Sequence, residues 1–111
     1  DGDGENDVLL GGDGNDGMQG GTGDDRLYGE AGADHLYGHT GRDVLFGGTG
    51  NDELYGDDDD DQLYGDEDDD LLFGGNGDDS LDGRLGNDRC DGGAQVVADT
   101  AWNCEGISNI P

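Results

Sequence analysis

The stretch GGTGNDELYG, residues 47–56, places three glycines within four residues, followed by an aspartate and a short apolar pair. With Gly47 counted as position 1, steps of nine residues find glycine at position 1 of every unit: Gly2, Gly11, Gly20, Gly29, Gly38, Gly47, Gly56, Gly65, Gly74, Gly83 and Gly92. Position 6 is always aspartate: Asp7, Asp16, Asp25, Asp34, Asp43, Asp52, Asp61, Asp70, Asp79 and Asp88. Position 8 holds one large apolar or sulfur-containing side chain per unit: Leu9, Met18, Leu27, Leu36, Leu45, Leu54, Leu63, Leu72, Leu81 and Cys90. A fixed short period predicts a solenoid, whose units bury their apolar side chains against neighbouring units.

The composition indicates that this solenoid needs a cation. The chain has 111 residues, 26 glycines, 29% hydrophobic content and a formal net charge of -26. Nucleic acids and anionic membranes are excluded as expected partners, because binding them requires a basic surface. Low hydrophobicity with high charge is typical of disordered chains. We therefore expect the chain alone to be disordered and a bound cation to order it.

The repeat unit predicts an all-β coil. Glycines at positions 1, 2 and 4 permit positive φ and close backbone approach, so several carbonyl groups can converge beside the aspartate. Position 8 and its two neighbours predict a three-residue strand whose middle side chain points inward. Two turns and two strands then close one coil in eighteen residues. Each unit should lie about 4.8 Å above the unit two positions before it.

This coil stacks aspartates that are eighteen residues apart. The predicted pairs are Asp7 with Asp25, Asp16 with Asp34, Asp25 with Asp43, Asp34 with Asp52, Asp43 with Asp61, Asp52 with Asp70, Asp61 with Asp79, and Asp70 with Asp88. Two carboxylates at this spacing repel each other by roughly 3 kcal/mol, and a divalent ion between them makes the interaction attractive. The pairs therefore predict up to eight ions.

The donor set selects the metal. Donors that are carboxylate and carbonyl oxygens suit a hard cation, and calcium accepts such a cage more readily than magnesium, which retains several waters. An EF-hand loop that begins at Asp57 is excluded, because its sixth and twelfth places are Gln62 and Asp68 instead of glycine and glutamate.

The unit resembles the G-G-x-G-x-D-x-U-x nonapeptide of the RTX (repeats-in-toxin, hemolysin-type) calcium-binding family. Full matches are GGDGNDGMQ from residue 11, GGTGDDRLY from 20, GGTGNDELY from 47 and GGNGDDSLD from 74. The resemblance implies a right-handed parallel β-roll, a β-solenoid with two nonapeptides per coil and about five coils, with Ca²⁺ between successive turns. It also implies that the ions take the position 6 aspartates and turn carbonyls. In the matching units the turn glycines are Gly11, Gly12, Gly14, Gly20, Gly21, Gly23, Gly47, Gly48, Gly50, Gly74, Gly75 and Gly77.

Several units depart from this pattern. Glu30, His39, Asp57, Asp66 and Arg84 replace glycine at position 2, and Asp59 and Asp68 replace it at position 4. These residues still offer a carbonyl, but positive φ is costlier for them than for glycine. We expect the sites that use Arg84 or Glu5 to be the weakest.

Aromatic side chains recur at position 9. Tyr28, Phe46 and Tyr64 should form a ladder on one face, and Tyr37, Tyr55 and Phe73 a ladder on the other. Shielding of the strand backbone is the interpretation we favour, with a binding or assembly surface as the alternative.

The chain divides into a repeat array, residues 1–91, and a C-terminal cap segment, residues 92–111. In the cap, Val97 stands where the next aspartate belongs, and Trp102, Ile107 and Ile110 could cover the open end. Cys90 occupies the last inward position, so we expect a disulfide with Cys104 in preference to free thiols. A disulfide predicts an extracellular location.

No catalytic constellation is evident in the sequence. We therefore expect a secreted, non-enzymatic calcium-binding module that folds when calcium binds, as a folding, export or structural part of a larger exoprotein. The chain begins at Asp1 without a methionine or a signal segment, and we expect it to be processed or part of a larger protein. The alternative is a subunit that associates end to end into a calcium-stabilised filament. No stretch predicts membrane insertion.

Overall fold

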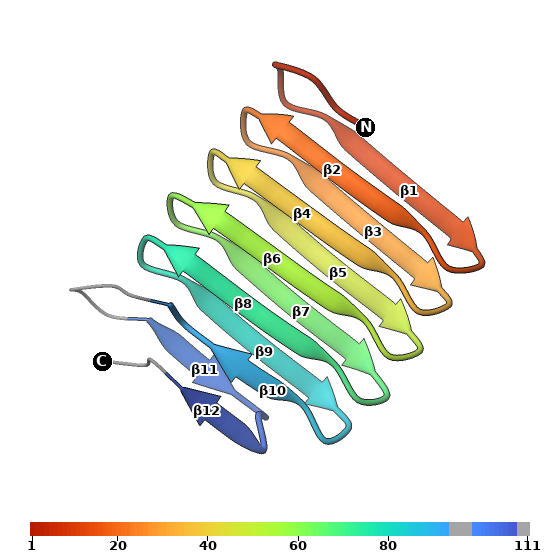
Figure 1. The fold of residues 1–111 in the computed structure, drawn as a ribbon, viewed down its shortest axis with the longest axis vertical. Helices are drawn as coiled ribbons and strands as arrows, with labels where there is room; N and C mark the ends of the chain where they lie inside the picture. Colours follow the sequence, from red (N-terminus) through yellow and green to blue (C-terminus); the bar gives the residue numbers. More distant parts are fainter. Residues whose placement is uncertain (94–98, 109–111) are drawn as a thin grey trace.

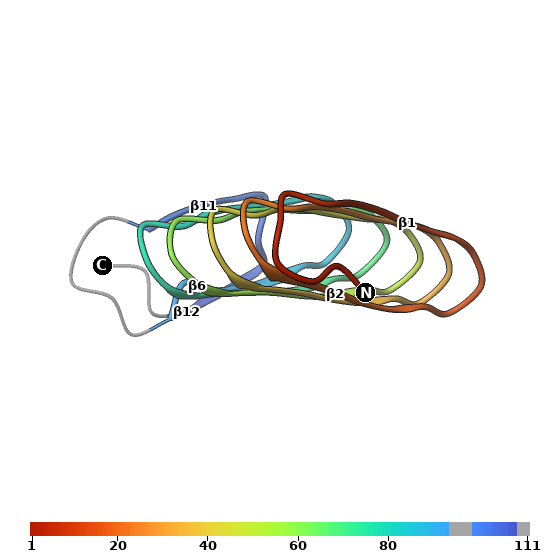
Figure 2. The ribbon, with the colours of Figure 1, turned by 90° about the horizontal axis from the view of Figure 1, so that it is seen from above.

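The computed structural model describes residues 1–93 and 99–108, which form a coil of short strands. The strands are β1 (Val8–Asp13), β2 (Gly17–Thr22), β3 (Arg26–Ala31), β4 (His35–Thr40), β5 (Val44–Thr49), β6 (Glu53–Asp58), β7 (Gln62–Glu67), β8 (Leu71–Asn76), β9 (Ser80–Leu85), β10 (Arg89–Asp91), β11 (Thr100–Trp102) and β12 (Gly106–Ser108). Consecutive strands alternate between two layers, as Figures 1 and 2 show. The described part of the chain has no helix with the length and hydropathy of a transmembrane span.

Each layer is one parallel sheet of six strands. The strand orders are β1-β3-β5-β7-β9-β11 and β12-β10-β8-β6-β4-β2. Strand partners lie eighteen residues apart through most of the array, so that Leu54 pairs with Leu72 and Tyr55 with Phe73. Two nonapeptides therefore make one coil, and the predicted all-β parallel β-roll of about five coils is confirmed.

The space between the sheets is filled by position 8. Leu27, Leu36, Leu45, Leu54, Leu63, Leu72 and Leu81 are each 0% exposed, and Met18 and Cys90 close the row at 5% and 1%. The molecule measures 33 × 30 × 13 Å between its Cα extremes. The roll is thin because each coil contributes only two inward side chains, one from each sheet.

The strands are longer than the sequence predicts. Nine of them have six residues, from position 7 of one unit to position 3 of the next. The prediction of three-residue strands was therefore wrong. The pairing of β1 with β3 skips position 1 and continues at positions 2 and 3, where Gly12 pairs with Glu30 and Asp13 with Ala31. The physical reason is that position 2 accepts a positive φ and still keeps the chain parallel to its neighbour.

The two predicted aromatic ladders are confirmed. Ring centroids of Tyr28, Phe46 and Tyr64 follow one another at 4.9 Å, with interplanar angles of 4° and 10°. Those of Tyr37, Tyr55 and Phe73 follow at 4.8 Å. The spacing equals that of parallel strands, so the rings stack because the coils stack.

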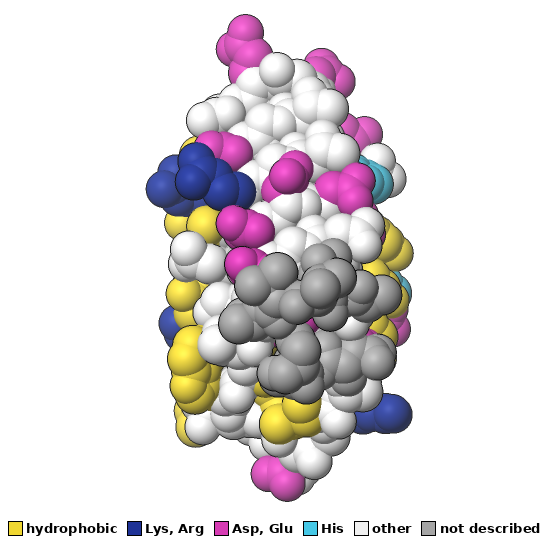
Figure 3. All heavy atoms as spheres, turned by 90° about the vertical axis from the view of Figure 1, so that its left-hand side faces the viewer, with side chains coloured by type: hydrophobic (Ala, Val, Ile, Leu, Met, Phe, Trp, Pro, Cys, Tyr) yellow, Lys and Arg dark blue, Asp and Glu magenta, His cyan; other side chains and the backbone are white. Residues whose placement is uncertain are grey.

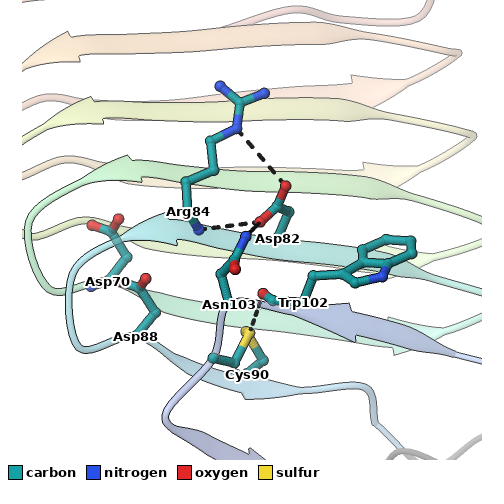
Figure 4. The surroundings of a disulfide bond; sticks show 8 residues. Asp70, Asp82, Arg84, Asp88, Cys90, Trp102 and Asn103 are labelled. Carbon is teal, nitrogen blue, oxygen red and sulfur yellow. Dashed lines mark hydrogen bonds and ion pairs between the residues drawn. A yellow bond between two sulfur atoms is a disulfide. The ribbon is translucent and has the colours of Figure 1, made fainter.

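The C-terminal residues add one strand to each sheet. β11 pairs with β9, and β12 pairs with β10. The predicted disulfide is confirmed: Cys90 and Cys104 are bonded with their Cα atoms 5.9 Å apart, and Figure 4 shows its surroundings. Trp102 and Ile107 remain 53% and 54% exposed. Val97 and Ile110 lie outside the described residues.

Candidate metal centre

The position 6 aspartates form two columns, one along each edge of the roll. Those that precede odd-numbered strands lie at the left-hand turns of Figure 1, and those that precede even-numbered strands lie at the right-hand turns. The left-hand column consists of Asp7, Asp25, Asp43, Asp61 and Asp79, and the right-hand column of Asp16, Asp34, Asp52, Asp70 and Asp88. Figure 3 views the left-hand edge, where acidic side chains stand among the turn backbone and hydrophobic side chains follow both margins.

Within a column, the backbone N–H of an aspartate donates a hydrogen bond to the aspartate one coil later in the chain. The backbone N–H of Asp25 donates to Oδ1 of Asp43 at 2.8 Å, and that of Asp34 donates to Oδ1 of Asp52 at 2.8 Å. The same bond occurs in all eight predicted pairs, at 2.7–2.9 Å. The aspartate carbonyl accepts in turn from the next coil, as when Val44 N–H donates to Asp25. Oδ1 of these aspartates thus helps to hold successive coils together.

In every position 6 aspartate except Asp7, whose Oδ2 accepts from Asp3 N–H at 3.2 Å, the other carboxylate oxygen has no hydrogen-bond partner among the described residues. Oδ2 is buried and unpartnered in Asp16, Asp25, Asp34, Asp43, Asp52, Asp61, Asp70, Asp79, Asp88 and Asp99. From Asp25 to Asp88 the whole residue is at most 1% exposed. Leaving one buried charged oxygen unpaired is costly, and repeating it ten times in one small molecule is unusual. Either a cation beside this oxygen or a proton on the carboxyl group would remove the cost.

Glycine at position 1 leaves the space beside this oxygen open. A Cβ on Gly47 would lie 2.5 Å from Oδ2 of Asp52 and 2.6 Å from the carbonyl oxygen of Gly65. Gly47 does not adopt a positive φ, nor do the other position 1 glycines of the described residues. The expectation that position 1 needs glycine for a positive φ was therefore wrong. Glycine is needed here because any side chain would occupy the space shared by the carboxylate and the carbonyl.

Positions 2 and 4 do adopt the predicted positive φ. Gly48 and Gly50 both have φ of 112°. In the units from Gly11 to Asp91, seven residues replace glycine there and follow the same path: Glu30, His39, Asp57, Asp59, Asp66, Asp68 and Arg84 have φ between 69° and 82°. Asp3 and Glu5 of the first unit do not adopt a positive φ. The backbone conformation of the turn is therefore imposed by the stack even where the residue disfavours it.

Burial makes these carboxyl groups reluctant to hold their charge. It raises the pKa of Asp61 and of Asp70 from 3.8 to about 8, although backbone hydrogen bonds partly oppose the shift. Burial also raises the pKa of Asp43, Asp52 and Asp79 to about 6, and it raises that of Asp88. Neighbouring carboxylates of the same column add to the rise. The protein alone therefore provides too little positive charge at these edges.

The ligands that the edges offer are oxygen atoms. Among residues 1–93 and 99–108, no three aspartate, glutamate, histidine or cysteine side chains gather where they could hold a metal by themselves. An ion at an edge would therefore need main-chain carbonyls as well as the paired carboxylates. Such a donor set suits calcium, which takes six to eight oxygen ligands in flexible geometry.

One buried aspartate was missed by the sequence reasoning. Val97 was expected in place of the next aspartate, but Asp99 takes this position: it is 4% exposed, and its Oδ1 accepts from Asp79 N–H at 2.9 Å. The nine-residue count fails here because Gly92 and Asp99 are two residues further apart than the frame requires. The signal that could have found it is the apolar and aromatic run after Asp99, which resembles the start of a strand.

The sheets, the columns and the unpartnered oxygens together define a calcium-binding structural β-roll. Comparison with protein families agrees: the model of the RTX calcium-binding nonapeptide repeat matches residues 1–36, 11–45, 37–72 and 64–95. The chain belongs to this family. No curated protein matches the sequence significantly.

Proposed function

We propose that the chain is a module that orders into its β-roll when calcium binds to the two aspartate columns. The observation that supports this most directly is the row of buried Oδ2 atoms without a hydrogen-bond partner. The position 6 aspartates would bind the ions together with carbonyls of the glycine-rich turns, and the eight in-frame pairs provide for up to eight ions. The binding free energy would then contribute directly to folding.

The same proposal places the module outside the cell and gives it no catalytic role. The Cys90–Cys104 disulfide supports an oxidising compartment. In the described chain the buried carboxylates lie in the columns, where ion binding would use them. A secreted protein could use such a module to fold only after export, or to stiffen an attached upstream domain. Residues 92–111 would end the roll as its cap segment.

Circular dichroism with and without calcium tests this function. We expect the chelator-treated chain to lack β-sheet signal, calcium to restore it cooperatively, and magnesium at equal concentration to leave the chain largely unfolded. Titration calorimetry then counts the ions. A chelator-treated chain that keeps the compact roll at about pH 7.5 would contradict the proposal.

A second candidate role is a calcium-stabilised filament built end to end. β1 and β2 each pair on one side only, and Val8 and Leu10 on β1 are 64% and 65% exposed. Unpaired strand edges with apolar side chains are templates for another chain. Fibres that grow with protein concentration in electron micrographs of the calcium-loaded sample would favour this role. A monomer at all concentrations would favour the module.

A further inference from the structure

Asp99 repeats the contacts of the in-frame aspartates although it lies outside the repeat. Asp79 N–H donates to Oδ1 of Asp99 at 2.9 Å across twenty residues, as Asp61 N–H donates to Oδ1 of Asp79 across eighteen. Thr100 N–H donates to the carbonyl of Asp79 at 2.8 Å, which matches the bond from Ser80 to Asp61. The left-hand column therefore continues by one more carboxylate.

The second oxygen of Asp99 has no hydrogen-bond partner in the part of the chain that the structure describes. Oδ2 of Asp99 and Oδ2 of Asp79 are both buried and unpartnered. The arginines and histidines of the described ion pairs contact other carboxylates. A purely turn-capping aspartate would need only its Oδ1 in this position. Oδ2 thus remains a buried charged oxygen that points to a cation.

The backbone at the start of this turn also lies as it does in the repeats. Gly93 has φ of 92°, close to the 107° of Gly75, which is its counterpart one coil earlier. A Cβ on Gly93 would overlap the carbonyl oxygen of Gly75. Gly93 and Asp99, the described residues on either side of 94–98, thus both lie against the turn that ends at Asp79. The carboxylates of Asp79 and Asp99 and the carbonyls of Gly75 and Gly93 belong to these described residues.

We propose that Asp79 and Asp99 bind an additional calcium ion, which attaches strand β11 to the roll. This inference rests on the proposed function and extends it past residue 95, where the family match ends. The last strand of each sheet would then be attached to the roll by a separate bond. The ion would hold β11 at Asp99, whereas the Cys90–Cys104 bond holds the segment that leads into β12. The open end of the roll would be closed only when both are present.

The test uses Asp99→Asn in the full chain. Asparagine keeps an Oδ1 acceptor for Asp79 N–H and nearly the same shape, but it removes the charge of the ligand. Asp78→Asn is the matched control, because it removes the same charge from an exposed residue beside Asp79. Trp102 is the chain's only tryptophan and ends β11, so its fluorescence reports this strand.

We expect the wild type and Asp78→Asn to bind the same number of ions and to show a calcium-dependent change in Trp102 emission. Asp99→Asn should bind one ion fewer, and its Trp102 transition should need at least about tenfold more calcium. Its circular dichroism should still show calcium-induced folding of the repeats. Asp99→Glu, which restores the charge on a longer side chain, should recover part of the shift.

An unchanged ion count and Trp102 midpoint in Asp99→Asn would overturn the inference and leave the proposed function intact. If neither the wild type nor any variant folded in response to calcium, the proposed function itself would fail. A mass measurement of the non-reduced chain checks that the disulfide has formed in each variant. A Trp102 shift in a variant that lacks the disulfide would count against the ion as its cause.

Discussion

Each position 6 aspartate uses its two carboxylate oxygens for different purposes. In the eight aspartates from Asp25 to Asp88, Oδ1 accepts a backbone N–H from the aspartate one coil earlier, and Oδ2 stays buried without a hydrogen-bond partner among the described residues. Asparagine would keep the first role and lose the second. The choice of aspartate in ten consecutive units therefore indicates selection for charge and not only for turn geometry.

At the residue scale, Gly47→Ala should damage a calcium site. The new Cβ would come within 2.5 Å of Oδ2 of Asp52 and 2.6 Å of the Gly65 carbonyl oxygen. Backbone strain is not the cause, because φ at Gly47 is not positive. We expect a loss of about 1–3 kcal/mol from the stability of the calcium-loaded roll, as for other overpacked sites. Calorimetry should show fewer bound ions.

Gly17→Ala is the control for this substitution. Gly17 begins β2, and a Cβ there would meet nothing within 4 Å. Because alanine restricts the unfolded chain more than glycine, we expect an unchanged ion count and equal or slightly higher stability. Equal losses in the two variants would show that the space beside Asp52 has no special role.

At the scale of the strands, stacked rings link one coil to the next. Phe46 on β5 lies between Tyr28 and Tyr64, with ring centroids 4.9 Å from each. The free face of Tyr64 is covered by the Arg84 guanidinium, whose Cζ is 4.7 Å from the ring centroid. These contacts join four coils on the outer surface, where the core leucines do not reach.

Phe46→Ala should weaken the roll more than Val44→Ala on the same strand. Phe46 loses two stacked pairs at about 0.5–1.5 kcal/mol each, in addition to its buried area. Val44 lies on the same strand between Arg26 and Gln62 and loses no aromatic partner. Urea unfolding in saturating calcium measures the difference, which we expect to be about 1–3 kcal/mol. Equal effects would mean that the ladder adds nothing beyond burial.

The strands also show how far the sequence could predict this structure. The positions of Asp52, Leu54 and Tyr55 recur every nine residues, so their edge, inward and outward places followed from the period alone. Cys90 was paired correctly because it occupies an inward place at the end of the array. Asp99 was missed because stacking constrains the ends of a turn but not its length. The six-residue strands were missed because a glycine with positive φ at position 2 does not resemble a strand residue.

At the scale of the whole molecule, charge opposes the fold unless it is neutralised. The chain has a formal net charge of -26, and its core consists of one inward side chain per strand. Self-repulsion of this size destabilises a compact state. Because the ion sites lie along both edges, calcium would act on every coil, and we expect one cooperative transition in place of independent local ones.

The calcium-free chain should therefore respond to pH in the direction opposite to that of most acidic proteins. Folding raises the pKa of Asp61 and Asp70 from 3.8 to about 8, and that of Asp43, Asp52 and Asp79 to about 6. The folded state then binds more protons than the unfolded state between about pH 4 and pH 8, so stability falls as pH rises through this window. We expect more β-sheet signal at about pH 4.5 than at about pH 7.5 in chelator, and a loss of this difference in saturating calcium. Protons should also compete with calcium, so that half-saturation needs more calcium at the lower pH. A calcium-free signal that grows from the lower pH to the higher one would show that the buried carboxylates are stabilised as anions without the ion.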